Sequence, residues 1–194
     1  MNPFTKYYHS NRYNKVESFL KSVYKERMKV VDLGSGACLW NKSKIPVIGV
    51  DISENLLSFG KENGYLSEFI LHDLEGKSLP FDKNSLDIIV MSEVLEHIHD
   101  PKKMLLEINR VTKPNGFLIL TVPYDTSISA WRYLFAMQCF LKGTIFRDTY
   151  YKHKCGHVQC FSPKSLSMLC SEAGFTVKSK KLTFLNIALL LQKE

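Results

Sequence analysis

The sequence predicts an α/β domain built around a mostly parallel sheet. Short apolar, β-branched runs alternate with helical segments, which is the pattern of repeated strand–helix–strand units. The first two runs, at 30–33 and 47–51, each carry an acid near their end, and a glycine turn follows the first of them. In open sheets of this kind a ligand lies outside the carboxyl ends of the strands. The same pattern therefore predicts both a fold class and a binding edge.

The strands are expected where β-branched and aromatic residues gather between turn signals. These expected strands are 29–33, 47–51, 68–71, 86–91 and 117–122, followed by a closing hairpin of 175–182 and 186–192. A turn is expected at 113–116, where Lys-Pro-Asn-Gly separates a helix from the fifth strand.

The helices are expected from apolar stripes and capping residues. A stripe predicts a helix over 13–26, whereas residues 1–12, polar and aromatic with little periodicity, are expected to form a mobile arm or lid. Ser53 is a good N-cap for a helix ending near 63–64. Asp100-Pro101 and Ser162-Pro163 each place a cap and an N1 proline before a helix, ending near 111 and 173.

The glycine turn after the first strand restricts the ligand chemistry. Gly34 and Gly36 allow close approach of a ligand, but no Lys-Ser/Thr pair follows, and Leu39 stands where a dinucleotide loop needs glycine. Asp32 would repel a pyrophosphate and suits a cationic ligand end, such as the ammonium and sulfonium of S-adenosylmethionine. Asp51 is placed to accept hydrogen bonds from ribose hydroxyls, a role shared by nicotinamide folds. A tight turn without a ligand is the alternative.

Several motifs together carry a resemblance to a known family. They are Asp32-Leu33-Gly34-Ser35-Gly36-Ala37-Cys38, His72-Asp73-Leu74, Ser92-Glu93-Val94-Leu95-Glu96-His97, Lys113-Pro114-Asn115-Gly116 and Gly156-His157-Val158. With these motifs the chain resembles class I S-adenosylmethionine-dependent methyltransferases, in the small-molecule group that includes the ubiquinone and menaquinone enzymes. It departs from Asp-x-Gly-x-Gly-x-Gly at Cys38, and residues 38–46 leave room for only one or two helical turns.

The resemblance implies a Rossmann-like three-layer sandwich with a seven-stranded sheet whose last strand is antiparallel. It also implies a cofactor site for S-adenosylmethionine. The residues that it assigns to this site are Asp32, Gly34, Gly36, Asp51, Ile52, Asp73, Leu74 and Ser92. Asp32 would pair with the methionine ammonium and Asp51 with the ribose, while the Ser92 carbonyl would add a contact to the ammonium.

The adenine end of the site is implied in the same way. Ile52 would cover one face of the ring, Asp73 would accept from its exocyclic amine, and the Leu74 amide would donate to a ring nitrogen. Asp73 could instead be only a turn acid at the end of the third strand. Glu93, Glu96 and His97 are expected to begin a helix, where Glu96 offsets the helix dipole; whether Glu93 and His97 form a polar rim of the site stays open.

The acceptor side offers fewer signals. Histidine is the natural general base at neutral pH, and His157 is the first candidate, because it follows the fifth strand beside the expected acceptor pocket. A structural role bonding a loop carbonyl is the alternative. Two histidines and two cysteines fall within residues 153–160, but such short spacing does not suit a tetrahedral zinc site, so no metal is expected.

One domain is expected to span residues 1–194, with an N-terminal arm and helix at 1–28 and an acceptor-side insertion at 128–161. The aromatic segment 128–146 suggests a lid helix; a dimer contact or an interfacial helix for a lipid-like acceptor are alternatives. The net charge of +7 is scattered, so a solvated basic surface is favoured, DNA is not expected and RNA is a weaker candidate. Five cysteines without a secretory pattern favour reduced thiols and a cytoplasmic location.

These observations favour methyl transfer to a small-molecule or lipid- or glycan-linked acceptor, with peripheral membrane contact as an option. An RNA or protein methyltransferase is the first alternative, although Asn/Asp-Pro-Pro-Tyr/Phe is missing after the fourth strand. A non-catalytic scaffold subunit is the second, motivated by Cys38 and the short first crossover. The sequence does not determine the oligomeric state.

Overall fold

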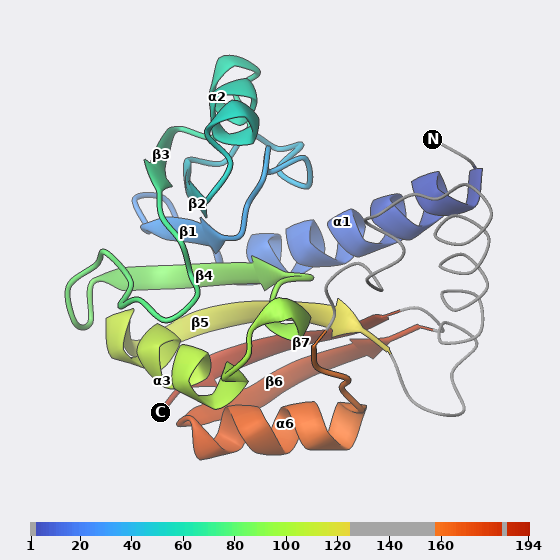
Figure 1. Cartoon of the computed structure of the whole chain (residues 1–194), viewed down its shortest axis with the longest axis vertical. Helices are drawn as coiled ribbons and strands as arrows, with labels where there is room; N and C mark the ends of the chain where they lie inside the picture. The colour runs from blue at the N-terminus through green and yellow to red at the C-terminus, as the bar shows by residue number, and fades with distance from the viewer. Residues whose placement is uncertain (1–2, 125–157, 184–185) are drawn as a thin grey trace.

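The computed structural model describes residues 3–124, 158–183 and 186–194. A seven-stranded sheet with the order β3-β2-β1-β4-β5-β7-β6 forms its centre (Figure 1). The strands are β1 (Val30–Leu33), β2 (Val47–Asp51), β3 (Glu68–Leu71), β4 (Leu86–Ser92), β5 (Thr112–Pro123), β6 (Phe175–Leu182) and β7 (Asn186–Lys193). Strand β7 is antiparallel to both of its neighbours, whereas β3, β2, β1, β4 and β5 pair in parallel. The predicted fold class is confirmed.

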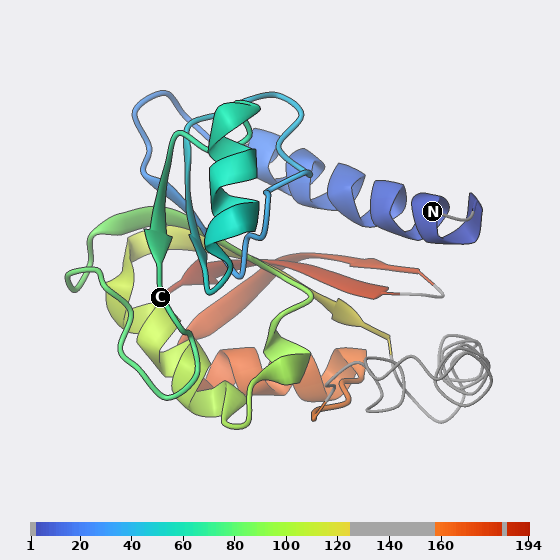
Figure 2. The same ribbon diagram turned by 45° about the horizontal axis from the view of Figure 1, so that its top comes forward.

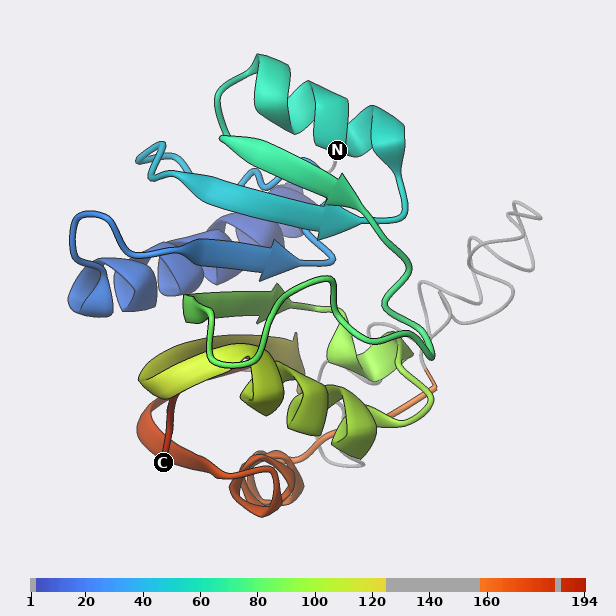
Figure 3. The same cartoon turned by 90° about the vertical axis from the view of Figure 1, so that its left-hand side faces the viewer.

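Strand β1 lies between β2 and β4, so the strand order reverses at this point. Figure 3 shows β1, β2 and β3 side by side with their arrowheads toward one edge. A crevice forms at such a reversal, outside the carboxyl ends of the strands. Leu33, the last residue of β1, is paired with Met91, the penultimate residue of β4, so the loops that follow the two strands start next to each other.

Helices cover both faces of the sheet (Figure 2). These helices are α1 (Pro3–Val23), α2 (Glu54–Glu62), α3 (Pro101–Val111) and α6 (Pro163–Glu172), with a short 3₁₀ helix, η1 (Leu95–His97), before α3. One apolar core lies between the sheet and α1 and α2, and includes Val16, Leu20 and Leu57. The other core lies beneath α3 and α6. Burial on both faces explains why the central strands are almost wholly apolar.

Capping chemistry fixes where two of these helices begin, as expected. The Asp100 side chain accepts from the Lys103 amide at 3.0 Å, and Pro101 is the first residue of α3. Ser162 and Ser165 form a reciprocal capping box at the start of α6. Ser53 precedes α2 at the predicted position but makes no side-chain cap. The starts of α3 and α6 therefore follow the sequence pattern closely.

The short connection 38–46, which leaves room for only one or two helical turns, contains turns and no helix. Three local predictions were wrong. Helix α1 begins at Pro3, so residues 3–12 are helical and do not form an arm. The helix expected from Glu93 is only the single 3₁₀ turn of η1, because Glu93 adopts a φ of +58°. Finally, the turn at 113–116 lies within β5, whose pairing with β4 jumps from Thr112 to Phe117.

None of the helices in the described ranges combines the length and apolar character that a membrane span needs.

Candidate cofactor-binding site

The loop after β1 is shaped by its glycines. The amides of Gly34 and Ser35 both donate to the Val50 carbonyl, at 2.8 and 3.2 Å, which ties the loop to β2. Gly34 has a φ of +70°, and a Cβ atom there would lie 2.4 Å from Cγ2 of Val94. Gly36 has a φ of +49°. Left-handed backbone disfavours L side chains, so both positions favour glycine, and only glycine fits beside Val94.

Asp51 holds this loop from the end of β2. Its Oδ2 accepts from the Gly36 amide at 2.7 Å, and its Oδ1 accepts from the Ser53 amide at 2.9 Å. A carboxylate has about four lone-pair sites, so two acceptor positions remain for a ligand. Asp51 therefore orders the loop and still presents acceptors to the cavity in front of it.

Asp32 lies below the loop and is only 2% exposed. Its Oδ2 accepts from the indole Nε1 of Trp40 at 2.7 Å. Burial raises the pKa of Asp32 to about 7, against the lowering effects of the Trp40 and Cys38 hydrogen bonds. A buried carboxylate without a cationic partner is costly, and a ligand cation would supply that partner.

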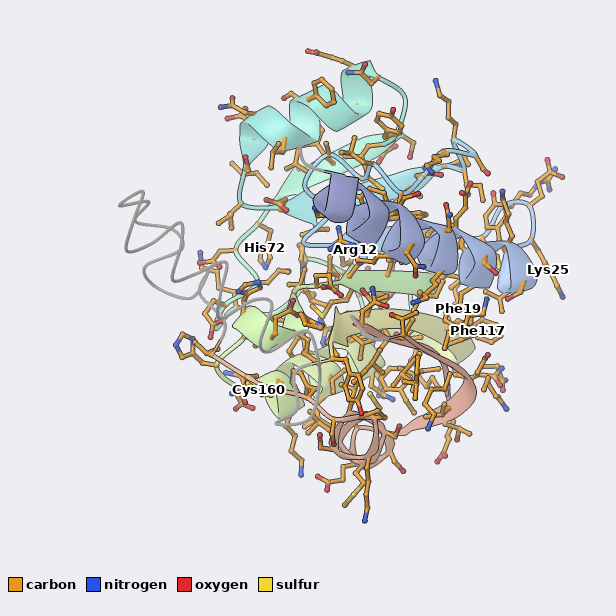
Figure 4. The ribbon with its side chains drawn as sticks, turned by 90° about the vertical axis from the view of Figure 1, so that its right-hand side faces the viewer. Arg12, Phe19, Lys25, His72, Phe117 and Cys160 are labelled. Carbon is orange, nitrogen blue, oxygen red and sulfur yellow. The ribbon has the colours of Figure 1, made fainter. Side chains whose placement is uncertain are left out.

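These residues share one cavity of about 290 Å³. Of the predicted site residues, the structure brings Asp32, Gly34, Gly36, Asp51 and Ser92 together in its lining. The lining also includes residues that were not predicted, among them Arg12 and Tyr13 on α1 and Trp40 in the loop. Figure 4 looks at the molecule from the side where α1 crosses the sheet, and labels Arg12 there. The helix was expected to begin at residue 13, whereas α1 begins at Pro3 and therefore extends beyond the ends of the strands.

The residues that were predicted to contact the adenine do not line this cavity. Ile52 follows Asp51 and is 71% exposed, which leaves its side chain free to cover a flat ligand. Asp73 lies just beyond β3, since the His72 amide still donates to the Asp51 carbonyl at 2.9 Å. Its Oδ1 accepts from the Glu75 amide at 2.9 Å, which is the turn-acid role of the alternative interpretation. Leu74 has a buried side chain that lines a separate cavity of about 440 Å³ against α3.

A polar chain of contacts continues from the cavity toward β5. The hydroxyls of Ser92 and Thr121 lie 2.9 Å apart, and Thr121 donates to Oε1 of Glu93 at 3.0 Å. The other carboxylate oxygen of Glu93 lies 3.9 Å from Nη1 of Arg12. Arg12, which lines the cavity, is thus connected to Glu93, the residue that directly follows β4.

Glu96, which was expected to offset a helix dipole, is a buried acid in the single turn of η1. It is 2% exposed, and burial together with the nearby Glu93 charge raises its pKa well above the usual value. Its backbone carbonyl accepts from the amides of Val158 and Gln159, at 2.9 and 3.0 Å. The segment that leads into α6 therefore packs over η1, which is a tertiary contact that no local sequence pattern reveals.

Lys15, one turn after Arg12, is held at the start of β7. Its Nζ donates to Oδ1 of Asn186 at 2.7 Å and to the Thr183 hydroxyl at 3.2 Å. Burial lowers its pKa to about 8, and the nearby charge of Lys181 adds to this lowering. The cationic residues of α1 therefore border the carboxyl edge from β1 to β7.

Cys38, which replaces the third motif glycine, has a φ of +53° and is 1% exposed. A left-handed residue explains why the family pattern has glycine at this position. Burial and the adjacent Asp32 raise the pKa of the Cys38 thiol, so it stays protonated. The substitution keeps the turn and adds a buried thiol beside the acid.

The predicted catalytic residue His157 lies outside the described residues, as does most of the 128–161 insertion. Within the ranges that the structure describes, no three His, Cys, Asp or Glu side chains gather in a way that could hold a metal ion. That finding does not reach the His153, Cys155 and His157 part of the segment considered for zinc.

The glycine loop and the strands that form the cavity lie in a segment that resembles a known family. Residues 31–120, just under half of the chain, match the methyltransferase domain family model. Together with the sheet order described above, this match supports a class I S-adenosylmethionine-dependent methyltransferase, a class whose cofactor is S-adenosylmethionine.

Individual relatives agree with this assignment. The demethylmenaquinone methyltransferase of Staphylococcus epidermidis is 29% identical over 164 residues, covering 76% of this chain and 67% of the relative. The Staphylococcus aureus (strain JH9) enzyme of the same name is 30% identical, but the match covers 56% of this chain and 45% of that enzyme. The chain thus spans between about half and two thirds of the length of these curated relatives.

Solved structures share the fold. A S-adenosylmethionine-dependent methyltransferase from Mesorhizobium loti superposes with a TM-score of 0.68 at 16% identity, covering 93% of this chain and 96% of that one. A SAM-dependent methyltransferase from Thermotoga maritima gives a TM-score of 0.71 at 20% identity, covering 96% and 91%.

Proposed function

We propose that this chain transfers a methyl group from S-adenosylmethionine to a small-molecule or lipid- or glycan-linked acceptor. The observation that carries the proposal is the cavity in which a buried Asp32, the glycine loop and Asp51 meet at the reversal of strand order. The named relatives methylate a quinone precursor, which supports a small acceptor. A location in the cytoplasm is part of the same proposal and agrees with free thiols at Cys38 and Cys170.

The cofactor supplies an electrophilic methyl group on a cationic sulfur, so the protein need not activate it. Asp32 would face the cationic amino-acid end, Asp51 would accept from the ribose, and the loop at Gly34 and Gly36 would let the ligand approach the backbone. Ile52, Asp73 and the Leu74 amide would contact the adenine, and the Ser92 carbonyl would join Asp32. The remaining task is alignment of the acceptor in a dry pocket.

The acceptor would enter on the side of Glu93, Glu96 and Arg12. We assign a proton-accepting role to His157, which precedes Val158, and the Val158 amide is bonded to the Glu96 carbonyl at the edge of this region. The 128–161 insertion would cover the acceptor within the single domain of 1–194. Contact with a membrane surface is expected only if the acceptor is lipid-linked.

A methyl-transfer assay with labelled S-adenosylmethionine tests the proposal. The full chain would be incubated with quinols, polyprenyl-linked glycans and tRNA, with the Asp51→Ala variant as a matched negative control. Label transfer to one of the small or lipid-linked acceptors supports the proposal. Transfer to tRNA alone would favour the RNA enzyme, and cofactor binding without transfer to any acceptor would favour a scaffold subunit.

A further inference from the structure

Trp40 occupies an unusual position for the only indole in the described part of the chain. It lies in the helix-free connection between β1 and β2, is 3% exposed, and packs in the core beneath α1. From there its Nε1 donates to Oδ2 of Asp32 at 2.7 Å. The short crossover therefore places a buried donor directly under the acid that faces the cofactor cavity.

The surroundings of Asp32 contain little other compensation. The loop supplies the Cys38 thiol and the Trp40 indole, β2 supplies the like charge of Asp51, and α1 supplies Arg12 at longer range. Among the described residues, no Lys, Arg or His nitrogen pairs with Asp32 within 4.0 Å. One Asp32 oxygen is thus held by a neutral donor, and the charge is left for a ligand to balance.

We propose that Trp40 is a positioning residue for the cofactor: its indole fixes one oxygen of Asp32 and directs the other oxygen toward the cofactor's cationic amino-acid end. This inference rests on the proposed cofactor site. It adds to that site a residue which the glycine motif does not contain, and this residue lies in the helix-free connection that follows the loop.

A proton balance follows from the same geometry. The carboxylate must be charged to pair with a cation, whereas burial raises the pKa of the unliganded Asp32 to about 7. Below that pH, binding of the cation therefore releases a proton from Asp32 to the solvent. The affinity is expected to fall by about tenfold for each pH unit below 7.

The test is calorimetry of the full chain with S-adenosylhomocysteine at pH 6, 7 and 8. Each titration is repeated in two buffers of different ionisation enthalpy, which counts released protons. Wild type is expected to bind about tenfold more weakly at pH 6 than at pH 8 and to release nearly one proton at pH 6. Trp40→Phe removes the donor, raises the pKa of Asp32, and is expected to weaken binding at pH 7 by about tenfold or more.

Phe19→Leu is the matched control, because Phe19 is 3% exposed in the same core but donates no hydrogen bond. It should lose stability while keeping the wild-type affinity and pH profile. If Trp40→Phe binds with the wild-type affinity and pH profile, the inference is overturned while the proposed function stands. If wild type does not bind S-adenosylhomocysteine at all, the proposed function and this inference fail together.

A wild-type measurement keeps the inference testable if Trp40→Phe does not fold. The indole N–H resonance of Trp40 in the unliganded protein should titrate with a midpoint near pH 7, and this titration should vanish in Asp32→Asn. An indole resonance that is unchanged between pH 5 and 9 would contradict the proposed link between Trp40 and Asp32.

Discussion

The two halves of the sheet's carboxyl edge are built in different ways. Around β1 and β2, backbone amides, two glycines and two strand-end acids form the cavity within a short stretch of sequence. Around β4, β5 and β7, side chains from distant segments meet, such as Arg12, Glu93 and Thr121. The first half fits a ligand common to a whole class, and the second can vary with the acceptor, because side chains change more freely than a backbone turn.

Asp32, the buried acid of the first half, gives the largest expected effect. Burial raises the pKa of unliganded Asp32 to about 7, against 3.8 for an ordinary aspartate such as that of the unfolded chain, so the free energy of unfolding falls as the pH rises through this range. Asp32→Asn should remove this loss and stabilise the unliganded protein at pH 8, by at most about 4 kcal/mol. Urea unfolding at pH 5 and 8 checks this, with a larger gain expected at pH 8. An equal effect at both pH values would mean that Asp32 is ionised throughout.

The glycine loop gives the next effect. Gly34→Ala combines left-handed backbone with a Cβ atom 2.4 Å from Val94, and should destabilise the fold by about 3 kcal/mol. Gly76→Ala is the matched control, because Gly76 has a φ of +72° but no atom within 4 Å of the added Cβ. It should cost only about 1 kcal/mol. Chemical denaturation of both variants measures the difference, and equal losses would show that the contact with Val94 is easily relieved.

Loss of Asp51 should act mainly on the ligand. Asp51→Ala leaves the Gly36 and Ser53 amides without their acceptor and removes the ribose contact, so we expect about 100-fold weaker binding of S-adenosylhomocysteine. Asp87→Ala is the control: Asp87 also accepts from a backbone amide, that of Lys29, but it lies near the start of β4. Calorimetry should show an unchanged dissociation constant for Asp87→Ala. Similar weakening in both variants would indicate general loss of structure.

The smallest effect on the cofactor is expected in the other half. Glu96→Gln should leave the dissociation constant for S-adenosylhomocysteine within about twofold, because Glu96 does not line the cavity and lies on the side where we propose that the acceptor enters. Since burial raises its pKa, the variant should be more stable than wild type at pH 8, and this gain should disappear at pH 4. Calorimetry and thermal unfolding check the two statements. A large loss of cofactor affinity would show that Glu96 contributes to cofactor binding, and would contradict the division of the edge into two halves.

The same division explains what could be predicted from sequence. The strands, α3, α6 and the loop of Gly34 and Gly36 follow from local signals, namely apolar runs, capping residues and turn glycines. Asp32 and Asp51 follow from their place at strand ends. Glu96 is contacted by residues 158–159, which lie far along the chain, so local sequence does not predict its burial. Arg12 lies in α1, and the start of this helix at Pro3 could not be predicted because residues 1–12 are polar and show little periodicity. Trp40 had a weak signal, as a large aromatic residue in a connection too short for a helix.

The most direct test of the account is a crystal structure of the full chain soaked with S-adenosylhomocysteine. We expect the product to occupy the 290 Å³ cavity, with its amino group against Asp32 and its ribose on Asp51. An empty cavity beside the glycine loop, or the product bound elsewhere on the molecule, would contradict it.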